Sequence, residues 1–144
     1  MKDEVIALMS LKLDESPVLR AESLPSENEI SDAETELGIP FGTDYRQFLL
    51  QFGGAMIGPY PIFGLRPVEV MGDNYWSVVD VTKRYRKDEI PGTNEWIVFS
   101  EDHSGNPVGF DQMGVIWTHD HDFDGIRRVC DSFEEYVRTK CLRS

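Results

Sequence analysis

His119 and His121 flank Asp120 and form the local cluster that most resembles a metal-binding site. Alternate residues of a β-strand share one face, so both imidazoles could reach one metal ion, with an Asp as the third ligand. A metal-dependent hydrolase would use such a site. The pair has little support elsewhere, because His103 is the only other histidine and Cys130 and Cys141 lack metal-type spacing. The pattern favours a polar strand end that runs into an Asp-rich hairpin, and we expect no metal and no cofactor.

A second set of oxygen ligands begins at Asp102, where Asp102, Ser104 and Asn106 imitate the first three ligands of a calcium-binding loop. Such a loop needs Gly at its sixth position and a bidentate Glu at its twelfth. Those positions hold Pro107 and Met113, so the pattern excludes an EF-hand and predicts a turn.

A group of glycines, Gly53, Gly54 and Gly58, could suggest a phosphate cradle. A cradle of this kind needs a following helix and a nearby cation. Here two prolines and a strand pattern follow, and the first cation is Arg66, so we interpret the glycines as a helix stop and a tight turn. The sequence also lacks a serine-hydrolase elbow, a P-loop and a Cys-x-x-Cys motif. We therefore predict a protein that is not an enzyme.

The charge of the chain is strongly unbalanced, with 14 basic and 26 acidic residues and a net of -12. Such a chain is repelled by nucleic acid and by anionic membrane surfaces, so an electrostatic partner should be basic. Solubility alone is the other interpretation of this acidity. Residues 1–36 carry a net of -7, and the bases in residues 83–87 are typical of a solvated helix face. Residues 101–124 hold no base and six acids: Glu101, Asp102, Asp111, Asp120, Asp122 and Asp124.

The length and composition suit one folded domain over residues 1–144, since 40% of the residues are hydrophobic and 11% are aromatic. The longest uncharged stretch, residues 47–65, contains glycines and prolines that would break a membrane-spanning helix. The first residues lack the basic flank and apolar core of a signal peptide, and two cysteines are too few for a disulfide framework. We therefore expect a cytoplasmic protein with reduced thiols.

The first third of the chain predicts helices. Residues 5–13 fit a helix or a strand, and we favour a helix. Ser26 and Glu29 form a capping box at the start of a second helix, and Gly38 supplies its left-handed stop. Residues 44–52 carry the apolar stripe of a third helix. Only a short connection joins the last two, so we expect them to pack as a helical hairpin.

After this hairpin the pattern changes to short strands separated by turn residues. A middle helix is expected over residues 75–86 with Trp76, Val79 and Tyr85 inward, and a C-terminal helix is expected to begin at Ser132. The expected strands cover residues 62–65, 67–70, 96–99, 108–110, 115–117 and 127–130. The predicted class is α+β, with an antiparallel meander of about five to six strands. An N-terminal helical hairpin, the middle helix and the C-terminal helix flank this sheet.

The helical hairpin carries Ile30-x-x-Ala33-Glu34-x-x-Leu37-Gly38, then Asp44-Tyr45-x-x-Phe48-Leu49 and Gly53-Gly54. Together with Trp96-Ile97-Val98-Phe99-Ser100-x-Asp102, Gly105-Asn106-Pro107-x-Gly109-Phe110-Asp111 and residues 115–122 and 132–136, this order of motifs resembles the SUKH superfamily. That group includes the yeast Smi/Knr cell-wall regulators. The resemblance covers about residues 26–138. Gly42 and Phe52 depart from the family pattern, which leaves the subfamily and its partner open.

The resemblance implies a non-enzymatic protein-binding module. Bacterial members are mostly immunity proteins, which bind and neutralise a toxin domain deployed between competing cells. A regulatory scaffold of cell-wall or glucan synthesis is the alternative that the resemblance leaves open. The matched residues are core-like, and none is catalytic in the family: Leu37, Tyr45, Phe48, Trp96, Phe99 and Phe133.

A basic toxin domain is the partner that this charge and this resemblance together predict. The predicted electrostatic rim comprises Asp102, Asp111, Asp120, Asp122 and Asp124. These acids lie on the turns and ends of one meander, so several should lie near one another. The candidate apolar anchors, unless they lie in the core, are Trp117, Trp76 and Tyr75. The size suits a monomer, although an exposed strand edge could support a weak homodimer. We expect no direct contact with nucleic acid or membrane.

Overall fold

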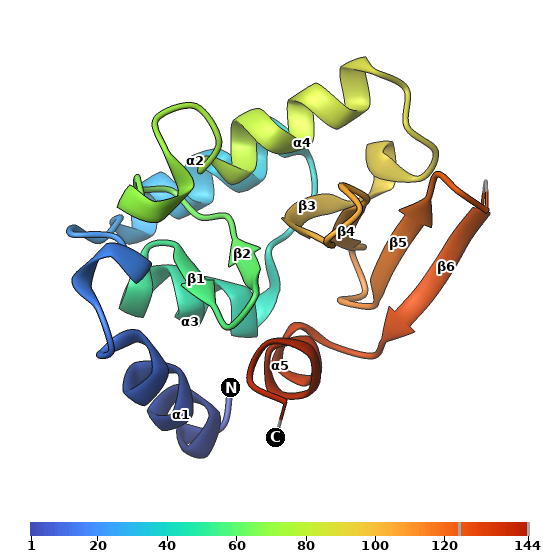
Figure 1. Ribbon diagram of the computed structural model, residues 1–144. Coiled ribbons are helices and arrows are strands. Elements are labelled where there is room, and N and C mark those ends of the chain that lie inside the picture. Colours follow the sequence, from blue (N-terminus) through green and yellow to red (C-terminus); the bar gives the residue numbers. More distant parts are fainter. Residues whose placement is uncertain (124, 144) are drawn as a thin grey trace.

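The computed structural model describes residues 1–123 and 125–143, and its centre is a six-stranded antiparallel sheet (Figure 1). The strands follow one another in sequence order: β1 (Ala55–Ile57), β2 (Tyr60–Ile62), β3 (Ile97–Glu101), β4 (Pro107–Phe110), β5 (Ile116–Asp120) and β6 (Gly125–Cys130). The helices are α1 (Asp3–Leu13), α2 (Glu27–Leu37), α3 (Gly42–Phe52), α4 (Val78–Lys87) and α5 (Phe133–Tyr136), which continues into a π-helical turn (Val137–Cys141). The predicted α+β class and antiparallel meander are confirmed.

Local capping signals fix the N-terminal helices. Ser26 Oγ accepts the Glu29 N–H at 3.2 Å, and the Glu29 carboxylate accepts the Ser26 N–H at 3.2 Å, so the predicted capping box is present. Gly38, with a φ of 75°, ends α2 in the left-handed conformation. The segment that fitted a helix or a strand is helix α1, and α3 begins at Gly42, slightly before its predicted start.

The first hairpin of the sheet, β1–β2, lies earlier than predicted. Of residues 62–65 only Ile62 belongs to a strand, and residues 67–70 contain none. Gly58, in the turn of the hairpin, has a φ of 59°, and a Cβ there would lie 2.3 Å from the Cys141 carbonyl oxygen. The two strand predictions are therefore wrong, because a tight turn pressed against the far end of the chain sets this hairpin.

Helix α4 begins later than predicted and turns a different face inward. Gly64 pairs with Ser77 in an isolated bridge, which keeps the residues before Ser77 out of the helix, and the Ser77 hydroxyl then caps α4. The buried residues of α4 are Val78, Val81 and Thr82. The residues predicted to point inward are half-buried instead: Trp76, Val79 and Tyr85.

Helix α4 also completes a part of β3 that the short strand β2 leaves open. β2 pairs with β3 only through Ile62 and Ser100. Farther along β3, the buried Thr82 hydroxyl accepts the Val98 N–H at 3.0 Å. A side chain of α4 thus takes the place of the missing strand neighbour, as a buried backbone N–H requires.

An aromatic cluster joins α3, α5 and the inner face of the sheet. Tyr45 and Phe48 of α3 lie 5.3 and 5.6 Å from Phe133 of α5, measured between ring centroids. Phe99 of β3 and Phe110 of β4 stack at 5.7 Å within the same cluster. The Tyr45 hydroxyl donates to a backbone carbonyl just after β2 at 2.5 Å, and burial raises the pKa of this phenol. These contacts hold β3, β4 and α5 in fixed relative positions, and the turns between the strands are positioned with them.

Candidate partner-binding surfaces

The acids of residues 101–124 divide between the two ends of the meander. Because neighbouring strands are antiparallel, the β3–β4 and β5–β6 turns lie at one end and the β4–β5 turn lies at the other. Asp102, Asp120 and Asp122 are therefore brought to one end, whereas Asp111 is at the opposite end. The first three of these acids thus share one end of the meander, and Asp124 lies outside the described residues.

The carboxylate of Asp102 organises the β3–β4 turn. Its Oδ1 accepts the N–H groups of Ser104 and Asn106 at 2.9 Å each, and its Oδ2 accepts the Asn106 side-chain amide at 2.9 Å. A carboxylate that accepts backbone N–H groups two and four residues ahead is an Asx-type turn. The pattern that imitated a calcium loop is therefore the turn that the sequence predicted.

The buried side chain of Asn106 joins this turn to the next hairpin. Asn106 is 3% exposed, and its Oδ1 accepts the His121 N–H at 3.1 Å and a bond from the ring Nδ1 of the same residue. Because the Asn106 amide nitrogen already donates to Asp102, Oδ1 must be the acceptor and His121 Nδ1 carries the proton. His121 Nε2 then lies 3.3 Å from Asp122 Oδ1. We call residues 102–106 and 120–123, linked in this way, the double hairpin.

The two histidines of the candidate metal pair have different surroundings. His119 is a buried strand residue paired with Ile126, whereas His121 is exposed on the hairpin and hydrogen-bonded to Asn106. Within residues 1–123 and 125–143, no three His, Cys, Asp or Glu side chains are grouped so that they could hold a metal ion. The described part of the chain therefore gives no support to a metal-dependent hydrolase.

Tyr75, a predicted anchor, is engaged inside the molecule. Its hydroxyl and that of Tyr85 both bond to the Glu101 carboxylate, and Arg84 lies 4.8 Å from the centre of the Tyr75 ring. Burial, and then the bond to Glu101, raise the pKa of Tyr75 to about 12. Tyr85 also lies 3.1 Å from the Gly105 carbonyl oxygen, so this network ties α4 to the double hairpin.

The two tryptophans predicted as anchors are half-buried and also use their indole N–H groups internally. Trp76 donates to the Asp73 carbonyl oxygen at 3.0 Å, and Trp117 donates to Asp111 Oδ2 at 2.9 Å. The apolar side chains that are most exposed lie instead on the turns. Phe123 of the double hairpin is 81% exposed and Met113 of the β4–β5 turn is 80% exposed. Residue type and spacing had singled out neither side chain, although a large apolar residue inside a polar turn is itself a signal.

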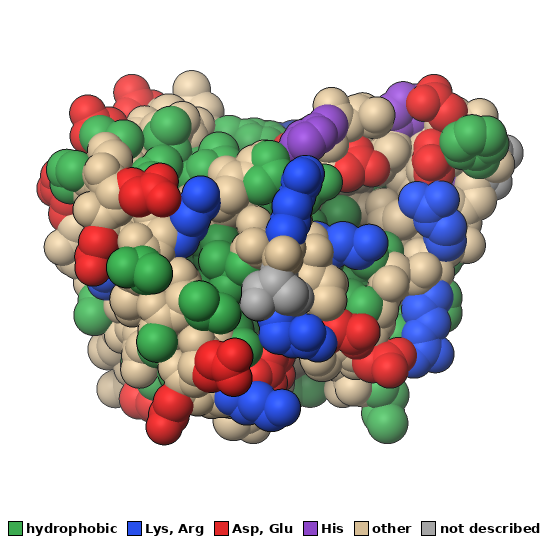
Figure 2. Space-filling model, turned by 60° about the horizontal axis from the view of Figure 1, so that its bottom comes forward, with side chains coloured by type: hydrophobic (Ala, Val, Ile, Leu, Met, Phe, Trp, Pro, Cys, Tyr) green, Lys and Arg blue, Asp and Glu red, His purple; other side chains and the backbone are tan. Residues whose placement is uncertain are grey.

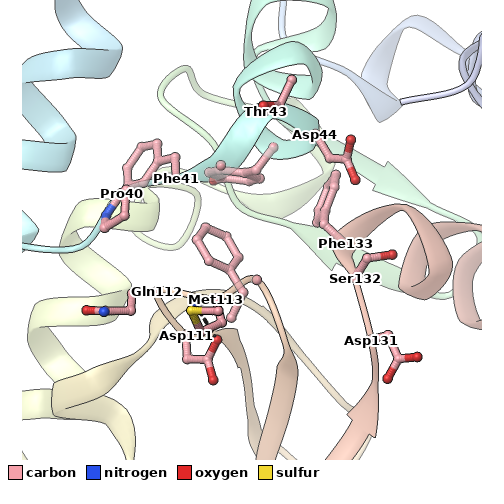
Figure 3. Close-up of a pocket in the computed structure, with 14 residues that line it drawn as sticks. Pro40, Phe41, Thr43, Asp44, Asp111, Gln112, Met113, Asp131, Ser132 and Phe133 are labelled. Atoms are coloured by element: carbon pink, nitrogen blue, oxygen red, sulfur yellow. Dashed lines mark hydrogen bonds between the residues drawn. The ribbon is translucent and has the colours of Figure 1, made fainter.

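The β4–β5 turn borders a cleft of about 350 Å³ that lies between α3 and α5 (Figure 3). Phe41, Phe110 and Phe133 give it an apolar lining, and Asp44, Asp111 and Asp131 lie at separate points around it. Asp111 Oδ1 accepts the N–H groups of Met113 and Val115, so this acid holds its own turn just as Asp102 does. The structure thus offers two surfaces at opposite ends of the meander, each with carboxylates beside an exposed apolar side chain.

A comparison with known families decides what kind of domain carries these surfaces. Residues 24–139 match the SMI1 / KNR4 family (SUKH-1). The chain belongs to this family. The matched span of the SUKH-1 chain runs from the residues before α2 into the C-terminal turn, so it includes the double hairpin and the β4–β5 cleft and leaves α1 outside. No curated protein matches the chain significantly. No helix in the described part of the chain combines the length and apolar character needed to cross a bilayer.

Proposed function

We propose that this SUKH-1 protein is a non-enzymatic immunity protein that binds and neutralises a basic toxin domain. The observation that supports this function best is the double hairpin, where Asp102, Asp120 and Asp122 lie on two turns held together by Asn106. The protein acts in the cytoplasm as a monomer or a weak homodimer. It needs no cofactor, and it contacts neither nucleic acid nor membrane directly.

Electrostatic attraction gives the double hairpin its first role. A net charge of -12 attracts a basic domain from a distance, and local acids orient the encounter. Steering of this kind raises association rates from about 10⁵–10⁶ to as much as about 10⁸ M⁻¹s⁻¹ at low salt. The Asp122 N–H donates to Asp120 Oδ1 at 3.0 Å, so the Asp120 carboxylate is held by its own turn before the partner arrives.

Phe123 gives the double hairpin its second role as an apolar anchor. The ring projects from the turn beside Asp122, where water surrounds most of its surface. Interfaces commonly place one aromatic side chain within a polar rim, and the aromatic side chain contributes most to slow dissociation. Tyr75, Trp76 and Trp117 are half-buried and internally bonded, so they support the surface rather than enter the partner.

The test first isolates the basic partner from the native cell by affinity capture. It then measures rescue of cell growth from that toxin domain together with association kinetics in vitro. We expect Asp120→Asn with Asp122→Asn to slow association at least tenfold at low salt and to flatten its salt dependence. Phe123→Ser should instead raise the dissociation rate at least tenfold.

Matched controls separate the surface from general properties of the chain. Glu22→Gln with Asp32→Asn removes the same charge from exposed acids far from the double hairpin in sequence, and Leu11→Ser removes another exposed apolar side chain. These controls should change either rate less than twofold. Equal effects of the control and test pairs would show that net charge, and not the double hairpin, sets the association rate. Failure to bind the toxin would refute the proposed function.

A further inference from the structure

The C-terminal part of the chain has the opposite charge to the rest. Residues 125–143 contain five bases and three acids, a net of +2, so the rest of the chain carries -14 (23 acids against 9 bases). Figure 2 shows Lys and Arg side chains across the middle and right of the face that it draws, with Asp and Glu side chains among them. This segregation means that one face of an acidic protein is suited to an acidic partner.

A cleft of about 240 Å³ lies on this face, between the inner side of the sheet and the C-terminal turn. Its lining residues are Tyr60, Asp102, Val108, Thr118, Arg127, Val129, Tyr136 and Lys140. Arg127 pairs with Thr118 across β5 and β6, which places its side chain on the inner face with the buried Thr118, whereas its neighbour Arg128 pairs with Trp117 on the other face. The cleft therefore receives one cation from β6 and one from the C-terminal turn.

These two cations are not neutralised by the rest of the protein. Among the residues that the structure describes, Arg127 and Lys140 form neither an ion pair nor a side-chain hydrogen bond, in contrast to Arg128, which pairs with Asp131. Asp102 also lines the cleft, but its oxygens already accept three hydrogen bonds from its own turn. The lining keeps a net charge of +1, which matches one carboxylate better than a doubly charged phosphate.

The size and walls of the cleft suit the end of a side chain. Pockets that enclose a whole small molecule measure about 300–1,000 Å³, so this cleft holds one functional group and leaves the remainder of a ligand outside. The Tyr60 ring stacks on His103 at 4.8 Å between ring centroids, which gives the cleft a fixed aromatic wall. A guanidinium fork and an ammonium group on either side of a carboxylate would form charge-assisted hydrogen bonds with it.

The edge of the sheet beside the cleft offers a place for the rest of such a ligand. β6 is the last strand of the sheet, and among the residues that the structure describes no further strand pairs with its outer edge (Figure 1). The outward N–H and C=O groups of an edge strand can pair with an added strand. A second copy is a poor occupant, because two-fold antiparallel pairing centred on Arg127 or on Arg128 would set that arginine opposite its own copy. An acidic strand at this edge would instead be attracted by Arg127.

We propose that β6 and the Arg127–Lys140 cleft bind an extended acidic segment of a partner protein, with one carboxylate seated between the two cations. This surface adjoins the double hairpin, because Asp102 lines the cleft and also holds the β3–β4 turn. Its cations and its acidic ligand are of opposite sign to those of the basic-partner surface, so it is tested without the toxin domain.

A peptide titration tests this proposal with the full chain. The probe is acetyl-Val-Glu-Val-Glu-Val-Glu-Val-amide, followed by amide chemical shifts of the ¹⁵N-labelled protein in 150 mM salt. We expect saturable binding with shifts concentrated in β6 and in the C-terminal turn. Arg127→Gln with Lys140→Gln should weaken binding at least tenfold, and the same peptide with Gln in place of Glu should not bind.

The matched control is Arg128→Gln, which removes one charge from the same strand on the face away from the cleft. It should weaken binding by no more than twofold. The single variant Arg127→Gln is measured beside it. Equal losses of affinity for Arg128→Gln and Arg127→Gln, or chemical-shift changes spread over the whole surface, would overturn the proposal in favour of unspecific charge attraction. A dimer in sedimentation that Arg127→Gln with Lys140→Gln dissociates would also overturn it, because the occupant would then be a second copy.

Discussion

Replacement of Asn106 by Ala removes the link within the double hairpin. The Asn106 amide group donates to Asp102, and its oxygen accepts two bonds from His121. No other side-chain hydrogen bond joins the described residues of the two turns to each other. Asn106→Ala therefore leaves an oxygen of the half-buried Asp102 carboxylate and the His121 backbone N–H without their protein partners.

The size of the effect follows from the three bonds. The bond to the charged Asp102 contributes about 2 kcal/mol, and each bond to His121 contributes about 1 kcal/mol. Water replaces part of this, since the His121 side chain is 55% exposed. We therefore expect the free energy of unfolding to fall by about 3 kcal/mol. For a domain of this length, that loss lowers Tm by about 6–12 °C.

Urea unfolding followed by tryptophan fluorescence measures the loss, and hydrogen exchange locates it. Exchange at the His121 amide should accelerate, whereas exchange in β1 and β2 should follow only the global change in stability. Asn94→Ala, an exposed asparagine in the turn before β3, is the control and should cost less than about 0.5 kcal/mol. A loss at Asn106 below about 1 kcal/mol, or an unchanged His121 amide, would refute the role that we assign to this side chain.

Three further substitutions test other parts of the fold. The hydrogen bond from Arg66 holds the pKa of Glu29 at about 2, below its ordinary value of 4.5. Glu29 therefore stabilises the fold above pH 4.5 and loses this effect as the pH falls through about 2, so Glu29→Gln should flatten the dependence of Tm on pH in that interval. Tyr45→Phe leaves a buried carbonyl without its donor and should lower the free energy of unfolding in urea by about 1–2 kcal/mol. Gly58→Ala should lower Tm far more than Gly105→Ala, because both glycines have positive φ but only Gly58 lies against another backbone. Equal losses at the two glycines would contradict the close packing that we assign to Gly58.

The elements that the sequence predicted correctly are those whose signals are local. The capping box at Ser26, the stop at Gly38 and the turns of the meander depend on residues within a few positions of one another. The β1–β2 hairpin was misplaced because its strands have three residues each and Gly58 is held by a turn more than eighty residues away in the sequence. The start of α4 was misplaced for a similar reason, since a bridge to Gly64 fixes the preceding Ser77.

The candidate surfaces were predicted by residue type but not by arrangement. The sequence singled out acids on turns. It did not show that the carboxylates of Asp102 and Asp111 accept backbone N–H groups of their own turns. The role of Asn106 was also hidden, because it depends on two hairpins that meet only in the folded sheet. The exposure of Phe123 was also hidden from the sequence, because it depends on the direction in which the folded turn projects.

The contact between α5 and the sheet has a consequence for the order in which the chain folds during synthesis. Consecutive strands of a meander can pair as soon as each leaves the ribosome. The ring of Phe133, however, lies against those of Tyr45, Phe48 and Phe99. A nascent chain that has released all six strands still exposes these rings to water until α5 emerges. Packing of α5 therefore completes the core. Until that step, a chaperone that recognises aromatic surface can still bind the exposed rings.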